Sequence, residues 1–545
     1  MKKSLSLILS IGILLSLAGF LPSPVHAETQ YRYASPEGLY SGDCTIETPC
    51  SLQRAVDLSN SAGDSADTTI YLKSGTYTAD SSMWYPEVIR ITNSVKLIGR
   101  CDFSSGNAVC VPENAPSILS GETVRRIIML QIPNPEVIHL TNLNLVYGNG
   151  NEQAANECPS GGEGEPLGCG GAIHRLGSVN DQNELKINNC VFQYNYGRVN
   201  TSPSSGEQGL GGAISLGNFG VLRIDNSTFD QNTAILDGYG YGGALYTHNS
   251  QVIILNTAFT RNRCTVYAKI GSGCALDIRN AEGLSEISSS SFELNNTNTT
   301  PANDKRRPGG AIYLMVPEQI KVAGNSFFEN DGDSAVVLYV REGSTENLIS
   351  RNKFWANFTD VALDIHYSPV GNGQAIVNVL HNFVGYQWGF DEDAYTTNGI
   401  QFSAPTSSHL AAHLWHNSLA CLDMGAHVVD LVDIDITNNI FGWVTEGVVA
   451  YTHYPPSGPE ITGTTNLTYF TNIVDLPDTD RINADPKFVS LMDGELHITK
   501  NSPAIDRAVN MGLVEDIDGD RREDGLPDIG ADEFVARLYL PLLVK

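Results

Sequence analysis

The sequence predicts an all-β fold: a single-stranded parallel β-helix, a solenoid of stacked coils, with a helical cap at its N-terminal end. Two recurring motifs support this prediction. An opening of small residues recurs at 170–173 (GGAI), 211–214 (GGAI), 242–245 (GGAL), 273–276 (GCAL) and 309–312 (GGAI). A Phe-x-x-Asn motif recurs at Phe192/Asn195, Phe229/Asn232, Phe259/Asn262, Phe292/Asn295, Phe327/Asn330 and Phe354/Asn357. Units of this size that cannot bury their apolar faces alone must stack on their neighbours.

The pattern of apolar residues between the motifs indicates strands rather than helices. The phenylalanines are 37, 30, 33, 35 and 27 residues apart, long enough for two amphipathic helices per unit. The apolar residues come instead in short alternating bursts, such as Leu185–Ile187, Val221–Ile224 and Ile320–Val322. Period-two bursts bounded by Asn, Gly and Ser are typical of strands and turns.

Asparagine also recurs just before the aromatic position. The residues concerned are Asn189, Asn226, Asn256, Asn325, Asn352, Asn382, Asn417 and Asn439. Asparagine tolerates left-handed backbone and hydrogen-bonds to its own turn. In coils about 4.8 Å apart, we expect equivalent Asn and Phe side chains to form ladders along the axis.

The paired GGAI and Phe-x-x-Asn motifs resemble the repeat of the polymorphic outer-membrane proteins. These belong to the larger class of right-handed parallel β-helix proteins, with a pectate-lyase-like fold. The resemblance covers Gly170 to Asn357 well and the flanks loosely. It implies a right-handed coil, in agreement with the crossover rule, and a surface passenger of the kind that this family uses for adhesion.

Residues 1–27 are predicted to be a secretory signal peptide. Lys2 and Lys3 precede an apolar run from Leu5 to Leu21, and small residues precede a cleavage site after Ala27. The alternative, an uncleaved anchor, is disfavoured because the run is short and is followed by Pro22. No later segment reaches the roughly 20 apolar residues of a spanning helix. We therefore expect export without a transmembrane span in the mature chain, which is either released or attached to the cell surface.

Charge and cysteine content agree with export. The formal net charge of −28 argues against nucleic acid and anionic membranes as partners, and we expect a monomer. Ten cysteines suit an oxidising compartment. Four pairs close in sequence are candidate disulfides: Cys44/Cys50, Cys101/Cys110, Cys158/Cys169 and Cys264/Cys274. Cys190 and Cys421 remain, and we expect both to be buried in the stack.

The N-terminal cap and first strands are assigned to 28–90. Thr48 and Pro49 resemble an N-cap followed by proline at the first helical position, and Leu52, Ala55 and Val56 give an apolar stripe. A helix here covers the open edge of the first coil, which would otherwise favour aggregation. A strand follows from about Thr69 to Tyr77.

The β-helix repeats are assigned to 91–490. Insertions interrupt the coils at 148–168, 199–209, 237–240, 267–271 and 296–308, each between a Phe-x-x-Asn and the next small-residue opening. Loops from equivalent points leave the same side of a solenoid. That side is the expected binding face, although tolerated surface variation explains the insertions equally well.

Candidate catalytic residues are few. Asp391, Glu392 and Asp393 form an acidic cluster of the kind that lyases on this fold use to hold calcium against a uronate. Without a basic partner nearby, a solvated turn explains it better. His409, His413 and His416 have a spacing that could hold a metal on a helix, but their apolar neighbours favour structural roles.

The C-terminal region divides into a module, 491–534, and an apolar tail, 535–545. Asp516, Asp518 and Asp520 alternate with other residues and are a candidate calcium site, although the EF-hand glycine and glutamate are absent. The strings 501–506 (NSPAID) and 527–534 (PDIGADEF) resemble the closing module of choice-of-anchor β-helix surface proteins. This resemblance implies a cap followed by an anchoring tail.

Three functions fit these observations. The first is an exported β-helix that binds polysaccharide, or a cell-surface glycan or protein, without catalysis. The second is an extracellular polysaccharide lyase or glycoside hydrolase acting on acidic glycans. The third is a structural envelope component. We favour the first because no catalytic constellation can be assembled from the sequence. No cofactor is required, with calcium as an open possibility.

Overall fold

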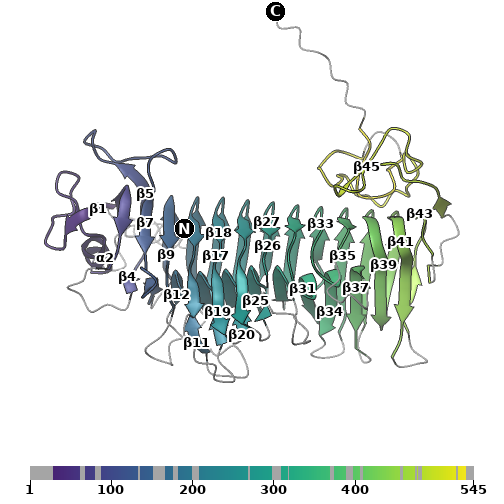
Figure 1. Ribbon diagram of the computed structural model, residues 1–545, viewed down its shortest axis with the longest axis horizontal. Helices are drawn as coiled ribbons and strands as arrows, with labels where there is room; N and C mark the ends of the chain where they lie inside the picture. The colour runs from purple at the N-terminus through teal and green to yellow at the C-terminus, as the bar shows by residue number, and fades with distance from the viewer. Residues whose placement is uncertain are drawn as a thin grey trace, which may run out of the picture.

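The structure, a computed structural model, describes 29–61, 68–79, 87–132, 135–150, 166–175, 182–198, 208–237, 239–267, 271–296, 309–316, 318–368, 373–387, 397–405, 409–453, 458–472, 475–476, 481–522 and 526–535. The signal segment 1–27, Cys158, the cluster Asp391, Glu392 and Asp393, and the tail beyond Val535 lie outside these residues. The described chain forms a long rod of stacked coils, with a compact module lying along one side of its C-terminal end (Figure 1). The predicted parallel β-helix is confirmed.

Three parallel sheets run along the rod, because each coil contributes a strand to each sheet. The first sheet comprises β1 (Gln30–Leu39), β2 (Thr68–Lys73), β5 (Val95–Asp102), β9 (Val137–Thr141), β13 (Asn183–Asn188), β17 (Ile214–Asp225), β21 (Leu245–Leu255), β26 (Leu284–Ser288), β29 (Gln319–Ala323), β32 (Asn347–Ser350), β35 (Ala375–Leu380), β38 (Leu410–Trp415), β40 (Val432–Thr437) and β42 (Glu460–Thr462). The second comprises β3 (Gly75–Tyr77), β7 (Ser117–Ser120), β10 (Leu143–Val146), β14 (Val191–Gln193), β18 (Thr228–Asp230), β22 (Ala258–Thr260), β27 (Ser291–Glu293), β30 (Ser326–Phe328), β33 (Lys353–Trp355), β36 (Phe383–Gly385), the first residues of β39 (Ser418–Asp430) and β41 (Ile440–Tyr451), β43 (Leu467–Tyr469) and β44 (Ile482–Asn483).

The third sheet carries the residues of most interest for function. It comprises β4 (Glu87–Ile91), β8 (Arg126–Leu130), β12 (Ile173–Arg175), the first residues of β17 and β21, β25 (Leu276–Arg279), β28 (Ile312–Val316), β31 (Ser334–Arg341), β34 (Val361–Ser368), β37 (Asn398–Ala404) and the last residues of β39 and β41. Along each strand, side chains alternate between the interior and the outside. Ile312 and Leu314, for example, are fully buried inside the rod.

The Phe-x-x-Asn motif forms two continuous ladders inside the rod. In the first, the phenylalanines stack face to face along the second sheet, with ring centroids 4.5–5.0 Å apart, and they are Phe192, Phe229, Phe259, Phe292, Phe327 and Phe354. In the second, the asparagines three residues later are all fully buried, and they are Asn195, Asn232, Asn262, Asn295, Asn330 and Asn357. Each asparagine donates its side-chain amide to the Oδ1 atom of the next, at 2.9–3.0 Å. The repeat spacing therefore places equivalent residues on matching positions of successive coils.

Other groups take over where the asparagine ladder ends. At its N-terminal end, Asn195 Oδ1 accepts the backbone N–H of Gly148 at 2.8 Å, so the preceding coil supplies backbone in place of an amide. At its C-terminal end, Gln387 takes the next position and donates its amide to the Phe354 carbonyl at 3.5 Å, as Asn357 does to the Phe327 carbonyl. The ladder thus spans the six coils that the motif predicts.

The second predicted asparagine ladder differs in part from the sequence interpretation. Asn325, Asn352, Asn382, Asn417 and Asn439 form it, each donating to the next. In the earlier coils its position belongs to Cys190, Ser227, Thr257 and Ser290. Asn189, Asn226 and Asn256 stand one residue earlier, where the backbone is left-handed with φ near 50°. Asparagine suits both positions, one for its amide and the other for its backbone.

Two small parallel sheets lie outside the main stack, beside the small-residue openings. One comprises β11 (Pro166–Cys169), β16 (Gln208–Leu210), β20 (Tyr239–Tyr241) and β24 (Gly271–Ser272). The other comprises β15 (Tyr196–Arg198), β19 (Thr233–Asp237) and β23 (Arg263–Tyr267). The first glycine of each opening has a positive φ, as at Gly211 (61°), which glycine adopts without steric cost. The openings are therefore turns that lead the chain into the third sheet.

The N-terminal cap is the helix α2 (Leu52–Asn60), packed against β1 and β4. Its N-cap is Ser51, whose hydroxyl accepts the Arg54 N–H, so the predicted start at Thr48 and Pro49 is wrong. Thr48 instead donates its N–H to the Thr45 hydroxyl within a turn, and Cys50 forms backbone bridges with β1. The helix therefore begins after these contacts, at Leu52.

Three of the four expected disulfides lie in the described chain, joining Cys44 to Cys50, Cys101 to Cys110, and Cys264 to Cys274. The second joins β5 to the antiparallel β6 (Val109–Cys110). Cys169 is also disulfide-bonded. Cys190 is buried and reduced, whereas Cys421, also reduced, is only partly buried.

Parallel stacking ends at β44, and the compact C-terminal module follows. It contains the antiparallel hairpin β45 (Phe488–Ser490) and β46 (Glu495–Ile498), so the module begins a few residues before the predicted boundary at 491. It covers outward-facing apolar side chains of the second sheet, notably Phe383 and Ile440. In the described residues, no helix is long and apolar enough to cross a membrane.

Candidate functional site

The outer surface of the third sheet presents two columns of side chains, because alternate residues of each strand point away from the core. In each repeat, the first outward residue directly follows the small-residue opening. In the register of the sheet, Asp277 pairs with Tyr313. Arg279 pairs with Met315, Met315 pairs with Tyr339 on the next strand, and Tyr339 pairs with His366 on the strand after that. Residues distant in sequence thus become neighbours about 4.8 Å apart along the rod.

The N-terminal part of this surface is closed. Tyr246 and Asp277 are fully buried, and Tyr246 packs with Leu210 and Tyr241 of the small sheet β11–β16–β20–β24. Arg279 donates to Asp277 at 2.7 Å and lies 4.6 Å from the ring centroid of Tyr241 and 5.4 Å from that of Tyr313. This guanidinium is held by tyrosines and a carboxylate, so it closes one end of the surface.

Beyond Arg279 the columns become partly accessible, over β28, β31, β34, β37 and β39. We call this region the tyrosine–histidine face. It consists of Tyr313, which is itself buried, and of the partly exposed Tyr339, Asp364, His366, Gln401, Ser403 and His427. Tyr339 stacks on His366 with centroids 4.8 Å apart and planes at 17°, and Tyr313 lies 5.5 Å from Tyr339. Three rings therefore follow one another over three coils.

A hydrogen-bonded network runs beside these rings. His366 Nε2 contacts Asp364 at 2.8 Å and its Nδ1 contacts the Ser403 hydroxyl at 2.7 Å. Gln401 Nε2 donates to Asp364 at 3.3 Å, and Gln401 Oε1 lies 3.1 Å from His427 Nδ1. The imidazole of His366 is thus fixed at both nitrogens, with 26% of its side chain exposed.

Burial also sets the protonation of this face. Burial, and then the charge of Asp364, raises the pKa of the Tyr339 phenol. Burial lowers the pKa of His427, with Asp364 opposing the change. At neutral pH Tyr339 and His427 are therefore uncharged hydrogen-bonding side chains.

Sequence reasoning did not identify this face. Its residues do not recur in sequence, and the chain between successive members varies in length from coil to coil. The sequence does carry one signal for outward-facing residues of the third sheet, namely the position directly after each small-residue opening. This position is occupied by Tyr246, Asp277 and Tyr313. The acidic cluster Asp391, Glu392 and Asp393 belongs to the segment 388–396 that precedes β37, outside the described residues.

The ladder residues that the sequence does predict contribute nothing to an accessible site. Asn195 and Asn330 are fully buried, as are the ladder asparagines between them. The Asn195 amide donates to the Leu145 carbonyl and to Asn232, and the Asn330 backbone N–H donates to Asn357 Oδ1. Because the interior uses these groups, the recurring motif marks the scaffold and not the ligand-binding surface.

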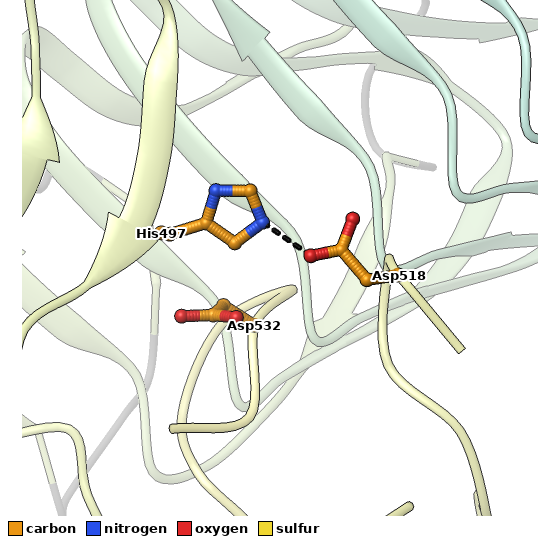
Figure 2. A group of neighbouring side chains, drawn as sticks. All are labelled: His497, Asp518 and Asp532. Atoms are coloured by element: carbon orange, nitrogen blue, oxygen red, sulfur yellow. Dashed lines mark hydrogen bonds and ion pairs between the residues drawn. The ribbon is translucent and has the colours of Figure 1, made fainter. Parts of the chain in front are cut away.

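A second cluster of polar groups lies in the C-terminal module. His497 of β46, Asp518 and Asp532 bring one ligand atom each within 4.8 Å of one another (Figure 2). His497 Nε2 contacts Asp518 at 2.6 Å, and its Nδ1 makes a close contact with Glu495. Three carboxylates therefore surround one imidazole where the module meets the rod.

The calcium candidates Asp516, Asp518 and Asp520 are placed differently from one another. Asp516 is buried, and one carboxylate oxygen accepts the N–H groups of Asp518 and Asp520 while the other accepts that of Glu533. Asp518 turns toward His497 instead. The structure thus groups Asp518 with His497 and Asp532, and calcium at the three aspartates stays a prediction.

Charge and burial compete in this cluster. Burial opposes protonation of His497, but the hydrogen bond to Asp518 and the charges of Asp532, Asp518 and Glu495 outweigh it, so its pKa rises to about 8. Burial raises the pKa of Asp532 to about 6, although the Ile498 N–H and the charge of His497 lower it. A 490 Å³ groove runs beside the cluster, lined by Asp518, Arg351, Lys353 and serines of β27 and β30.

Comparisons with known proteins bear on the fold only. No protein-family model and no curated protein sequence matches the chain. XylC in complex with xylose is 10% identical at a TM-score of 0.45, over 93% of this chain and 98% of that one. A mannuronic acid specific polysaccharide family 6 lyase from human gut microbiota is 13% identical at 0.37, over 84% and 83%. Pectate lyase Pel9A is 12% identical at 0.27, over 94% and 98%. At these identities and TM-scores the likenesses carry no argument about function.

Proposed function

We propose that this protein is exported and binds polysaccharide, free or at a cell surface, on its tyrosine–histidine face. The observation that carries the proposal is the stacked pair of Tyr339 and His366, with Tyr313 tilted beside it, next to a polar network on neighbouring coils. Sugar rings pack their C–H faces against aromatic rings, and their hydroxyls need donors and acceptors at fixed positions. Tyr339 and His366 offer the apolar ring surface that their mutual stacking leaves accessible, and Asp364, Gln401 and Ser403 offer donors and acceptors.

The rod itself suits a polymer. Coils that repeat at about 4.8 Å present equivalent positions along an extended surface, so several sugar units can be contacted in sequence. Disulfides in the described chain and the predicted signal segment support an extracellular location. Attachment through the C-terminal tail and a role in adhesion follow from the sequence resemblance and belong to the same proposal.

The test is binding to a panel of neutral and uronic-acid polysaccharides, measured by affinity electrophoresis. We expect Tyr339→Ala to weaken binding of the best ligand about two- to tenfold, because one aromatic contact contributes roughly 0.5–1.5 kcal/mol beyond its buried area. Tyr31→Ala is the matched control, since Tyr31 is an exposed, stacked tyrosine at the opposite end of the rod. Equal loss in both variants, or no retention by any polysaccharide, would contradict the proposal.

The second candidate function, an extracellular lyase or glycoside hydrolase acting on acidic glycans, draws on a specific feature. His366, held by Asp364 and Ser403, is placed as a general base or acid would be. Incubation with uronate polysaccharides and calcium should give no ultraviolet-absorbing unsaturated product and no new reducing ends if the protein only binds. Turnover that His366→Ala abolishes would establish the catalytic alternative in its place.

A further inference from the structure

We propose that the C-terminal module holds a divalent first-row transition-metal ion between His497, Asp518 and Asp532. The three side chains come from separate segments of the module: β46, the loop that follows Ile517, and the final turn before Phe534 (Figure 2). Their ligand atoms lie within 4.8 Å of one another. A tetrahedral ion with ligands at about 2.0–2.2 Å separates them by roughly 3.4 Å, so small rotamer adjustments suffice.

The groups behind the three ligands are an independent reason for this proposal. Histidines that ligate metals almost always give their other ring nitrogen to a carboxylate or carbonyl, which fixes the ring and its tautomer. Glu495 occupies that place at His497 Nδ1, leaving Nε2 toward Asp518. Asp532 is oriented by the Ile498 N–H at 2.7 Å, and the imidazole edge packs on the Phe383 ring at 4.9 Å. His497 and Asp532 are thus held in place by the fold before any ion arrives.

The balance of charge in the module also favours a cation. Four carboxylates, those of Asp516, Asp528, Asp532 and Glu533, have less than a tenth of their residue surface exposed. Arg522 is buried among them and contacts Glu533 at 3.0 Å. Arg522 and His497 face four buried acids and Asp518, with Arg351 and Lys353 in the adjoining groove, so acids still outnumber bases here. A divalent ion between His497, Asp518 and Asp532 would offset this excess of negative charge.

The donor set selects the kind of ion. Calcium takes six to eight oxygen ligands, whereas one imidazole nitrogen with two carboxylates suits zinc, manganese or iron(II). Three protein ligands leave a position for water. Asp518 also lines the neighbouring groove, so this position is reached from solvent. The ion would join three segments of the module and hold Asp518, beside the buried Ile517, against the rod.

The experiment uses the full mature chain without a histidine tag, stripped with a chelator and titrated with Co²⁺, Zn²⁺ or Ca²⁺. We expect one Co²⁺ per chain with visible d–d absorption, displaced by Zn²⁺, and a zinc-dependent rise in melting temperature. Asp518→Asn should abolish uptake while leaving the fold intact, since this side chain is 42% exposed. Glu495→Gln should weaken uptake about tenfold through His497. Glu515→Gln is the charge-matched control, because Glu515 pairs with Arg351 outside the cluster.

Three results would overturn the proposal. They are no stoichiometric Co²⁺ or Zn²⁺ uptake by the folded wild-type chain, equal uptake by wild type and Asp518→Asn, and a cobalt spectrum unchanged by His497→Gln. Circular dichroism checks the fold of each variant. If His497→Gln does not fold, the comparison of wild type with Asp518→Asn remains as the test. Calcium uptake that Asp520→Asn abolishes and His497→Gln preserves would place the cation at Asp516, Asp518 and Asp520 instead.

Discussion

Each asparagine in the middle of the Phe-x-x-Asn ladder uses its whole hydrogen-bonding capacity inside the rod. Asn262 Nδ2 donates to the Phe229 carbonyl and to Asn295 Oδ1, while Asn262 Oδ1 accepts the backbone and side-chain N–H groups of Asn232. A buried amide is costly unless it is fully paired, and here the next coil completes the pairing. The ladder therefore fixes the register of one coil on the next.

Removing one amide from the middle of this ladder should be strongly destabilising. Asn262→Ala removes the acceptor of the Asn232 backbone N–H and of one Asn232 amide hydrogen, and it removes the donor to the Phe229 carbonyl. We therefore expect a loss of about 3 kcal/mol in the free energy of unfolding. Denaturant titration followed by circular dichroism measures it. Gln251→Ala, which removes an amide at the exposed edge of the same coil, should cost well under 1 kcal/mol. Similar losses would show that the ladder is not the source of stability.

At this scale the sequence predicts interior residues better than functional ones. Phe and Asn recur from Asn195 to Asn330 and beyond because each coil needs the same side chain at the same interior position, so spacing alone reveals the ladders. Tyr339 and His366 lie on the outside, where neighbouring coils need different side chains, and no repeat marks them. The ligands around His497 meet only through the turns of the module, which sequence periodicity does not describe. The candidate site therefore required coordinates.

The C-terminal module is the element whose docking depends most on histidine. His416 is buried at the contact, with Nδ1 against the Asp528 carbonyl at 3.2 Å and Nε2 against the Asn438 amide at 2.9 Å. Since Nδ1 must donate and Nε2 must accept, the imidazole is neutral. The His381 ring lies beside it, tilted at 53° with centroids 5.5 Å apart, and Arg522 is a nearby cation. Protonation of His416 would break one hydrogen bond and set two cations side by side.

Module docking should therefore weaken in mild acid. Burial, and then the charge of Arg522, lowers the pKa of His416 well below its usual 6.5. A base whose folded pKa is depressed contributes stability that is fully present above its unfolded pKa and is lost as the pH falls below about 6.5. Below that pH, each further unit lowers the free energy of unfolding by about 1.4 kcal/mol for every proton taken up on unfolding.

Calorimetry between pH 7.5 and 5 measures this dependence. His416→Asn keeps a residue that tolerates the left-handed backbone, with φ of 53°. It should make the pH dependence shallower but not remove it, because burial also lowers the pKa of the neighbouring His381. His409→Asn removes a largely exposed imidazole and should leave it unchanged. If stability falls with pH at the same slope in the wild type, His416→Asn and His409→Asn, then His416 does not control docking.

The whole molecule is a one-dimensional array, because each coil contacts mainly the coils before and after it. In such arrays the ends open more readily than the middle, unless caps cover them. Here α2 covers the first coil and the C-terminal module covers one side of the last coils (Figure 1). Both caps raise the cost of opening from the ends, so we expect the interior to open only when the rod unfolds cooperatively.

The two reduced cysteines of the described chain report on this cooperativity. Cys190 is buried in the interior with its thiol pKa raised to about 12 by burial, whereas Cys421 lies near the C-terminal end and is only partly buried. We expect a thiol reagent to modify Cys421 in the native protein and Cys190 only at the rate of global opening. Cys421→Ser serves as the control that isolates the slow reaction. If Cys190 reacts in that variant as fast as Cys421 does in the wild type, while the circular dichroism remains native, the coils open one by one and the rod is not a cooperative unit.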